Sequence, residues 1–130
     1  MLAYSPLAQG LLSGRYDSGN RPTNRVRAGN PLFLPENLQR ASELLAVLAE
    51  VAAAHSATSA QIALAWVIRH PAVAAIPGAS SVEQLERNVA AAEIDLTDDQ
   101  YQALGDAAAR FRPLTGPAVF PRLARARIGR

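Results

Sequence analysis

The segment from Val73 to Asn88 constrains the fold more than any other part of this 130-residue chain. It begins with a short apolar run that stops at Pro77-Gly78, and a serine-rich helix start follows directly. A parallel strand that passes into a helix has this pattern. Backbone N–H groups converge at such a helix start and favour a bound phosphate. The pattern fits an ordinary strand–turn–helix corner without a ligand equally well, so this segment alone leaves both interpretations open.

The serines of this corner predict how the helix begins. Ser80 stands three residues before Glu83, and Ser81 stands three residues before Gln84. Both pairs have the spacing of a capping box, in which the two side chains satisfy free backbone N–H groups at the helix start. Gly78 lets the backbone approach a ligand closely because it has no side chain. The corner is therefore a candidate anion site.

The chain opens with a second strand-to-loop passage. A short run ending at Tyr4 enters a loop that contains Pro6, Gly10 and Gly14. An aromatic face at a strand end can hold a planar ring, and small residues beyond it let backbone donors reach an anion. The alternative from composition alone is that Tyr4 packs in the core and Arg15 is a solvated loop cation.

Helices are expected between and after these strands. One begins near Glu36 with apolar residues at three- and four-residue steps, and two others begin at capping-box sequences. These boxes are Thr58–Gln61, whose helix ends at Pro71, and Thr97–Gln100. Strands near residues 2–5 and 73–76, separated by helices, fit a βαβ unit with parallel strands. The Gly-, Pro- and Asn-rich stretch 15–36 is expected to be a long loop.

Two segments carry a resemblance to a known family. They are Leu2-Ala-Tyr-Ser-Pro-Leu-Ala-Gln-Gly-Leu-Leu-Ser-Gly-Arg-Tyr16 and Ile76-Pro-Gly-Ala-Ser-Ser-Val-Glu-Gln-Leu-Glu-Arg-Asn88. Together they resemble the end of the aldo-keto reductase family, NADPH-dependent carbonyl reductases on a (β/α)8 barrel. The resemblance covers roughly residues 2–109 and falls on the last two strands of such a barrel. It implies an α/β fold, a partial (β/α)8 TIM-type barrel that is a C-terminal fragment with about two parallel strands and several helices. A complete barrel typically needs about 250 residues, so 130 are not expected to close one.

The resemblance also implies residues that bind NADP(H). Tyr4 would stack on the nicotinamide ring, and the pyrophosphate would be lined by Ser5, Leu7, Gln9 and Gly10, with added charge from Arg15. The 2′-phosphate and adenine would be surrounded by Gly78, Ala79, Ser80, Ser81, Gln84, Arg87 and Asn88. The stretch 15–36 would be a lid over the cofactor, although simple mobility explains its composition as well.

Four positions depart from the usual pattern of the family. Many members have Lys-Ser at Gly78-Ala79 and Arg at Gln84, and Glu is usual at Arg87. The guanidinium of Arg87 stands where a carboxylate normally meets the adenine amino group, and it is able to pair with a 2′-phosphate instead. The choice between NADP and NAD therefore stays open.

No catalytic residue is assigned to this chain. Hydride transfer in the resembled family uses a tyrosine acid, a lysine and an aspartate that tune it, and a histidine, all from earlier strands. No residue here matches them, and all 13 basic residues are arginine. We therefore expect cofactor binding without a complete reduction by this chain alone. His55 and His70 are interpreted as helix C-terminal caps, and Trp66 as a core residue.

Composition excludes several classes of protein. With no cysteine, the chain has no disulfide and no thiolate metal site, and a cytoplasmic setting is the default. No apolar run is long enough to span a bilayer, and the N-terminus lacks the layout of a signal peptide. Residues 1–109 are expected to form the cofactor-binding portion. Residues 110–130 are expected to be a poorly ordered tail. This segment has no acidic residue, and its arginines are Arg110, Arg112, Arg122, Arg125, Arg127 and Arg130.

Three functions stay open, in this order of preference. The first is the cofactor-binding portion of a reductase, truncated or completed by another chain or by self-association. The second is a non-catalytic nucleotide-binding or protein-interaction module. The third is a basic arm for nucleic acid or acidic partners, which is disfavoured because the tail lacks interleaved aromatic residues.

Overall fold

Two parallel strands and several helices make up residues 1–128, the part of the chain that the computed structural model describes. The strands are β1 (Leu2–Tyr4) and β2 (Ala74–Ile76). The α-helices are α1 (Arg25–Ala28), α2 (Pro35–Ala54), α3 (Ser59–Ile68), α4 (Val82–Ala90), α5 (Asp98–Arg110) and α6 (Phe120–Ile128). Short 3₁₀ helices are η1 (Ala8–Ser13), η2 (Pro31–Phe33), η3 (Ala91–Glu93) and η4 (Pro117–Val119).

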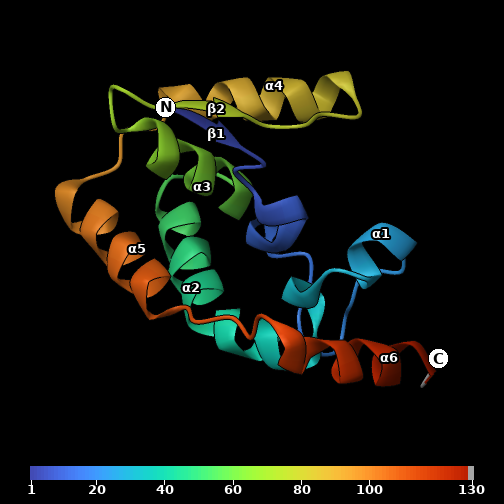
Figure 1. Cartoon of the computed structure of the whole chain (residues 1–130). Helices are drawn as coiled ribbons and strands as arrows, with labels where there is room; N and C mark the ends of the chain where they lie inside the picture. The colour runs from blue at the N-terminus through green and yellow to red at the C-terminus, as the bar shows by residue number, and fades with distance from the viewer. Residues whose placement is uncertain (129–130) are drawn as a thin grey trace.

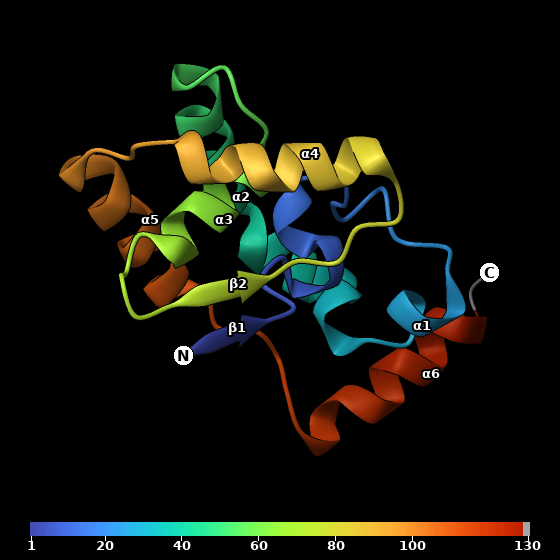
Figure 2. The ribbon, with the colours of Figure 1, turned by 90° about the horizontal axis from the view of Figure 1, so that it is seen from above.

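The two strands pair in parallel, as predicted. Leu2 lies opposite Ala74 and Tyr4 opposite Ile76, so both carboxyl ends lie at the same edge of the sheet. Figure 2 shows the arrows side by side, with α4 running along β2. Because side chains alternate across a strand, Leu2, Tyr4 and Ile76 share one face of the sheet, and that face is exposed.

The core lies between α2, α3 and α5 (Figure 1). Its buried side chains are Leu44, Leu48, Val51, Ala52, Ile62, Ala63, Ala65, Leu96, Leu104 and Ala107. Trp66 packs at the edge of this cluster, and its indole Nε1 donates to the Tyr101 carbonyl oxygen at 3.2 Å. The predicted core position of Trp66 is therefore confirmed, although the side chain is only half-buried.

Local signals placed the helix ends well. The capping boxes of Thr58 with Gln61 and of Thr97 with Gln100 both form. His55 caps the end of α2, and its Nε2 lies 2.8 Å from Gln100 Oε1. Arg69 instead of His70 is the C-cap of α3, so that prediction was one residue late.

The predicted Ser80–Glu83 capping box does not form. Ser81 is the N-cap of α4, and its hydroxyl accepts a hydrogen bond from the Gln84 N–H at 3.1 Å. Glu83 pairs with Arg87 one turn later, at 2.7 Å. Because the N-cap is Ser81 and not Ser80, Glu83 is the second helical residue and not the third, which a capping box requires. Its side chain faces Arg87 instead, since i,i+4 side chains lie on the same side of a helix.

The stretch 15–36 is mostly irregular, as predicted, but it contains the one-turn helix α1 and η2. Each turn begins with an asparagine whose side chain accepts a nearby backbone N–H. Asn24 accepts from Val26, and Asn30 accepts from Leu32, both at 2.9 Å. Asparagine favours such local caps, so the signal for both turns was present in the sequence.

The segment after α5 returns along α2 and ends in α6 (Figure 1). Arg110 forms a salt bridge with Glu43 at 2.7 Å, and this contact raises the pKa of Arg110. The predicted poor order of this tail stays a prediction, and Gly129 and Arg130 lie outside the described residues.

Within residues 1–128, none of the helices is by itself long and apolar enough to cross a membrane. Helices α2 and α3 reach that length and composition only as a pair, with a 93° bend between them.

Candidate cofactor-binding site

The parallel pairing of β1 and β2 brings the two candidate loops together. Each loop leaves the carboxyl end of its strand, so the two emerge side by side at one edge of the sheet. They line a pocket of about 400 Å³ that we call the corner pocket. Its lining residues are Ser5, Pro6, Leu7, Gln9, Gly10, Arg27, Pro77, Gly78, Ala79, Ser80 and Gln84. In open α/β sheets ligands bind outside the carboxyl ends of the strands.

The backbone of the first loop is unusual. Ser5, Ala8 and Gln9 have φ of 52°, 47° and 58°, and Gly10 has φ of 99°. Non-glycine residues rarely adopt this left-handed region, and such residues cluster at functional sites. The loop therefore holds a conformation that its own sequence does not favour.

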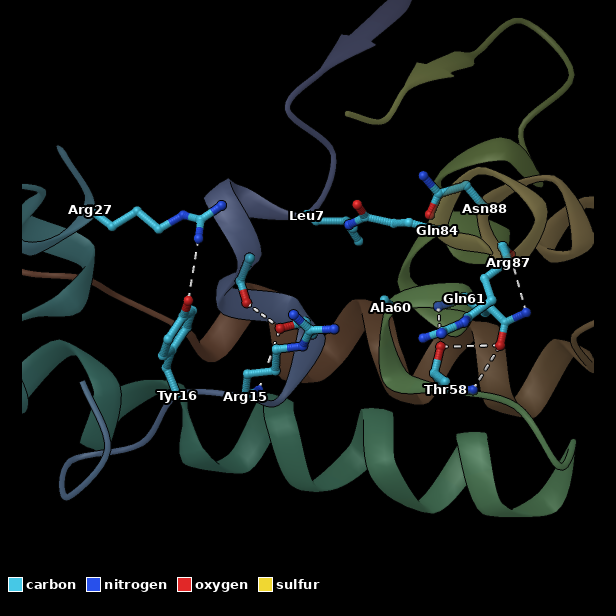
Figure 3. A pocket seen from close by; sticks show the side chains of 12 residues that line it. Leu7, Arg15, Tyr16, Arg27, Thr58, Ala60, Gln61, Gln84, Arg87 and Asn88 are labelled. Carbon is cyan, nitrogen blue, oxygen red and sulfur yellow. Dashed lines mark hydrogen bonds between the residues drawn. The ribbon is translucent and has the colours of Figure 1, made fainter. Parts of the chain in front are cut away.

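A second pocket of about 170 Å³ adjoins the first and shares Leu7, Gly10, Arg27 and Gln84 with it. We call it the arginine pocket, and Figure 3 shows its side chains. The remaining lining residues are Ser13, Arg15, Tyr16, Thr58, Ala60, Gln61, Arg87 and Asn88. Because four residues belong to both pockets, the two form one groove between the first loop, the turn α1 and helix α4.

The groove is positively charged. Arg15, Arg27 and Arg87 line it, and no Asp or Glu does. In residues 1–128, Arg15 and Arg27 form no ion pair, whereas Arg87 pairs with Glu83. Guanidinium groups and small residues without a carboxylate suit an anion such as a phosphate. Among residues 1–128, no group of three or more His, Asp or Glu side chains is placed so that it could hold a metal ion.

Helix α3 contributes the floor of the arginine pocket. Gln61, whose side chain caps α3, also donates from Nε2 to the Arg87 carbonyl oxygen at 3.1 Å. This bond ties the start of α3 to the middle of α4. The arginine pocket is thereby fixed between two helices that are distant in the sequence.

Comparison with known proteins supplies the family. The sequence matches the model of the Aldo/keto reductase family over residues 1–109. The chain belongs to the aldo/keto reductase family. Its two strands and their helices are accordingly part of an α/β barrel, which confirms the predicted fold class.

Several relatives are reductases or oxidoreductases. An uncharacterized oxidoreductase of Mycobacterium tuberculosis is 54% identical over the whole chain, which covers 40% of that protein. Aldo-keto reductase str7 of Strobilurus tenacellus is 37% identical over 80% of this chain and 32% of the relative. Aldo-keto reductase yakc of Schizosaccharomyces pombe, whose name includes NADP(+), is 30% identical over 92% of this chain and 38% of the relative. The chain thus spans two fifths or less of the length of these relatives.

Most of the residues predicted from the aldo-keto reductase resemblance line the groove. Tyr4 and Ser81 do not. Tyr4 is 85% exposed on the open face of β1, and the Ser81 hydroxyl is engaged in capping α4. The roles of all these residues in this aldo-keto reductase chain stay predictions.

Arg27 is the main groove residue that the sequence analysis missed. It lies on α1 in the stretch expected to be a lid, yet it lines both pockets. Its Nη1 donates to the Tyr16 hydroxyl oxygen at 3.4 Å, a long hydrogen bond. Thr58 and Gln61 were recognised only as a helix cap. A family-implied lid was a hint toward Arg27, but nothing local distinguished it from the neighbouring arginines.

Proposed function

We propose that this chain is the NADP(H)-binding portion of an aldo-keto reductase that reduces carbonyl compounds by hydride transfer. One observation carries the proposal. The loops that follow two adjacent parallel strands line a single groove with three arginines and no acidic residue. A dinucleotide with a pyrophosphate needs an elongated, cationic site of this kind.

The residues of the chain take separate roles in this proposal. Tyr4 stacks on the nicotinamide ring at the exposed strand end, and Ser5, Leu7, Gln9 and Gly10 line the pyrophosphate. Gly78 and Ala79 let the second loop approach the phosphates, while Asn88 and Gln84 face the adenosine end. The bound cofactor supplies the hydride. We assign the proton donor to a segment or chain other than these 130 residues.

The proposal also covers the cellular compartment and the protein chains that would complete the enzyme. A complementing chain would supply the missing catalytic groups, in the cytoplasm and without nucleic acid, whereas a second copy of this chain would only cover its exposed surface. A non-catalytic nucleotide-binding module would use the same groove. Reductase activity of the chain when it is mixed with a complementing chain distinguishes the two functions, because a non-catalytic module would show none.

Titration with NADPH tests cofactor binding directly. Trp66 lies in the core and not in the groove, so protein fluorescence is a poor probe, and amide resonances of the ¹⁵N-labelled chain are a better one. We expect weak binding, with a Kd near 1 mM or about 4 kcal/mol. The Gly10 and Gly78 resonances should shift, while Gly105 on α5 should not. A chain that is folded but shows no shift of Gly10 or Gly78 contradicts the proposal.

A further inference from the structure

Helix α6 of the arginine-rich tail lies beside the turn α1, as Figures 1 and 2 both show. Gly29 at the end of α1 and Phe120, Leu123 and Ala124 of α6 line a pocket of about 300 Å³ between them. We call it the tail pocket. It shares no lining residue with the corner pocket or the arginine pocket, so it is a separate feature of the surface.

The walls of the tail pocket are apolar. None of its lining residues has a polar side-chain atom, and Phe120 is 71% exposed, so one wall is open to solvent. The volume lies at the lower end of the range for ligand pockets, which is about 300–1,000 Å³. Because removing apolar surface from water is favourable, a pocket of this kind takes up an apolar group and not a free anion.

The surroundings of the tail pocket are cationic. Residues 18–35 and 107–128, which contain α1 and α6, have no Asp or Glu. Their arginines are Arg21, Arg25, Arg27, Arg110, Arg112, Arg122, Arg125 and Arg127. Arg25 and Arg125 are exposed, and each lies within about one helical turn of a residue that lines the pocket. Neither forms an ion pair with another of residues 1–128, so both guanidinium groups are available to a partner.

We propose that the tail pocket is a docking site for an acidic segment of another protein. The segment places an apolar side chain in the pocket and pairs its carboxylates with Arg25 and Arg125. Guanidinium groups form charge-assisted hydrogen bonds with carboxylates, and aromatic residues and arginine are enriched in protein–protein interfaces. This surface lies apart from the groove, so the inference does not depend on the proposed function.

Two other anionic partners fit this surface less well. Single-stranded nucleic acid stacks its bases on several aromatic rings, and in residues 18–35 and 107–128 Phe120 is the only exposed ring, since Phe33 is buried and Phe111 half-buried. A helix that binds a bilayer lies with a continuous apolar face in the interface. Helix α6 instead contributes its apolar residues to the wall of a pocket, which a projecting side chain fills better than a flat surface does.

Fluorescence anisotropy of two labelled peptides tests the inference. One peptide has a central phenylalanine between stretches of glutamate, and the matched peptide has glutamine in place of every glutamate. The wild-type chain should bind the acidic peptide at least about tenfold more tightly. Arg25→Gln and Arg125→Gln should each weaken this binding about threefold, as for exposed ion pairs. Phe120→Ala should weaken it about tenfold, because it removes a wall of the pocket. Arg15→Gln removes the same charge at an exposed site outside the tail pocket and should leave the affinity unchanged.

Three outcomes would overturn the inference. The first is equal affinity for the acidic and the glutamine peptide. The second is a loss with Arg15→Gln as large as with Arg25→Gln, because net charge would then be the cause. The third concerns two other probes, namely vesicles of phosphatidylcholine with phosphatidylserine and a single-stranded oligonucleotide. If binding of either depends on Arg25, Arg125 and Phe120 while the acidic peptide does not bind, the occupant is a lipid surface or a nucleic acid and not an acidic protein segment.

Discussion

Single residues decide how the segments around the groove are held in place, and Asn37 is the clearest case. It is fully buried near the start of α2. Its Nδ2 donates to the carbonyl oxygens of Pro31 and Leu114, at 2.8 and 3.2 Å, and its Oδ1 accepts from the Leu114 N–H at 2.7 Å. One amide thereby connects the end of the 15–36 stretch with the segment after α5. Asn37 and Leu114 are 77 residues apart along the chain.

Replacing Asn37 tests this connection. Asn37→Ala removes three hydrogen bonds and leaves the partly buried backbone N–H and carbonyl of Leu114 without these partners, so we expect a loss of about 2–3 kcal/mol in the free energy of unfolding. Urea denaturation measures it. Gln102→Ala, which removes only an exposed hydrogen bond to Asp106, is the control and should cost less than about 0.5 kcal/mol. Equal losses in the two variants would mean that Asn37 does not hold these segments together.

Gly78 allows a test of the charge of the corner pocket. An added Cβ at Gly78 meets no atom within 4 Å, and φ at this position is not in the left-handed region, so the backbone accepts a side chain there. Gly78→Glu should weaken NADPH binding at least about tenfold, or about 1.4 kcal/mol, because a carboxylate repels the pyrophosphate. Gly78→Gln adds nearly the same bulk without the charge, so Gly78→Glu should bind NADPH clearly more weakly than Gly78→Gln does. If glutamine and glutamate reduce binding alike, bulk is the cause and charge is not.

At the scale of elements, helix caps do more than end the helices. Gln61 caps α3 and bonds to α4, and Gln100 caps α5 and lies against His55 at the end of α2. Each of these two capping side chains thus caps one helix and contacts a second one. A change at a cap should therefore alter both the stability of one helix and its contact with the next.

The α3 cap makes a measurable case. Thr58→Ala removes the hydroxyl that accepts the Gln61 N–H at 3.3 Å, and we expect a loss of about 1 kcal/mol in the free energy of unfolding. Thr58→Ser keeps the hydroxyl and should lose much less. Gln61→Ala should cost more than Thr58→Ala, since it also breaks the bond to the Arg87 carbonyl. Denaturation of all three variants in urea decides the order, and an unchanged stability of Gln61→Ala would contradict it.

Considered as a whole, the molecule leaves a large apolar area in contact with solvent. On the open face of the sheet Leu2 is 69% and Tyr4 85% exposed, and Val82, Leu85 and Val89 on α4 are all more than half exposed. Only two strands pair within residues 1–128, and an isolated two-stranded sheet is marginal in water. Such surfaces are typical of an interface with another chain or segment.

Self-association of the isolated chain follows from this surface. We expect light scattering after gel filtration to find dimers or larger species, and thermal unfolding to be broad. Leu85→Glu should shift the distribution toward monomer, because it places a charge on the exposed face of α4. Val26→Glu, on the equally exposed α1, is the control and should leave the distribution unchanged. A monodisperse monomer with a sharp cooperative melt would argue against this expectation.

The sequence by itself determined the elements and the family. Capping boxes, the stripe of apolar residues on α2 and the two short apolar runs are local patterns, and each produced its element within a few residues. The ordered set of motifs from Tyr4 to Asn88 was enough to indicate the barrel and a dinucleotide site. These features are readable because their causes lie within about one helical turn of each residue.

Only the tertiary structure decided how the groove is completed. It brought Arg27 to both pockets and joined Asn37 to Leu114 across the fold. None of these follows from local pattern, because whether a side chain lines a pocket, forms an ion pair or is buried depends on which distant segment lies opposite it. That pairing is set by the packing of the sheet and helices as a unit, and not by the identity of any one residue.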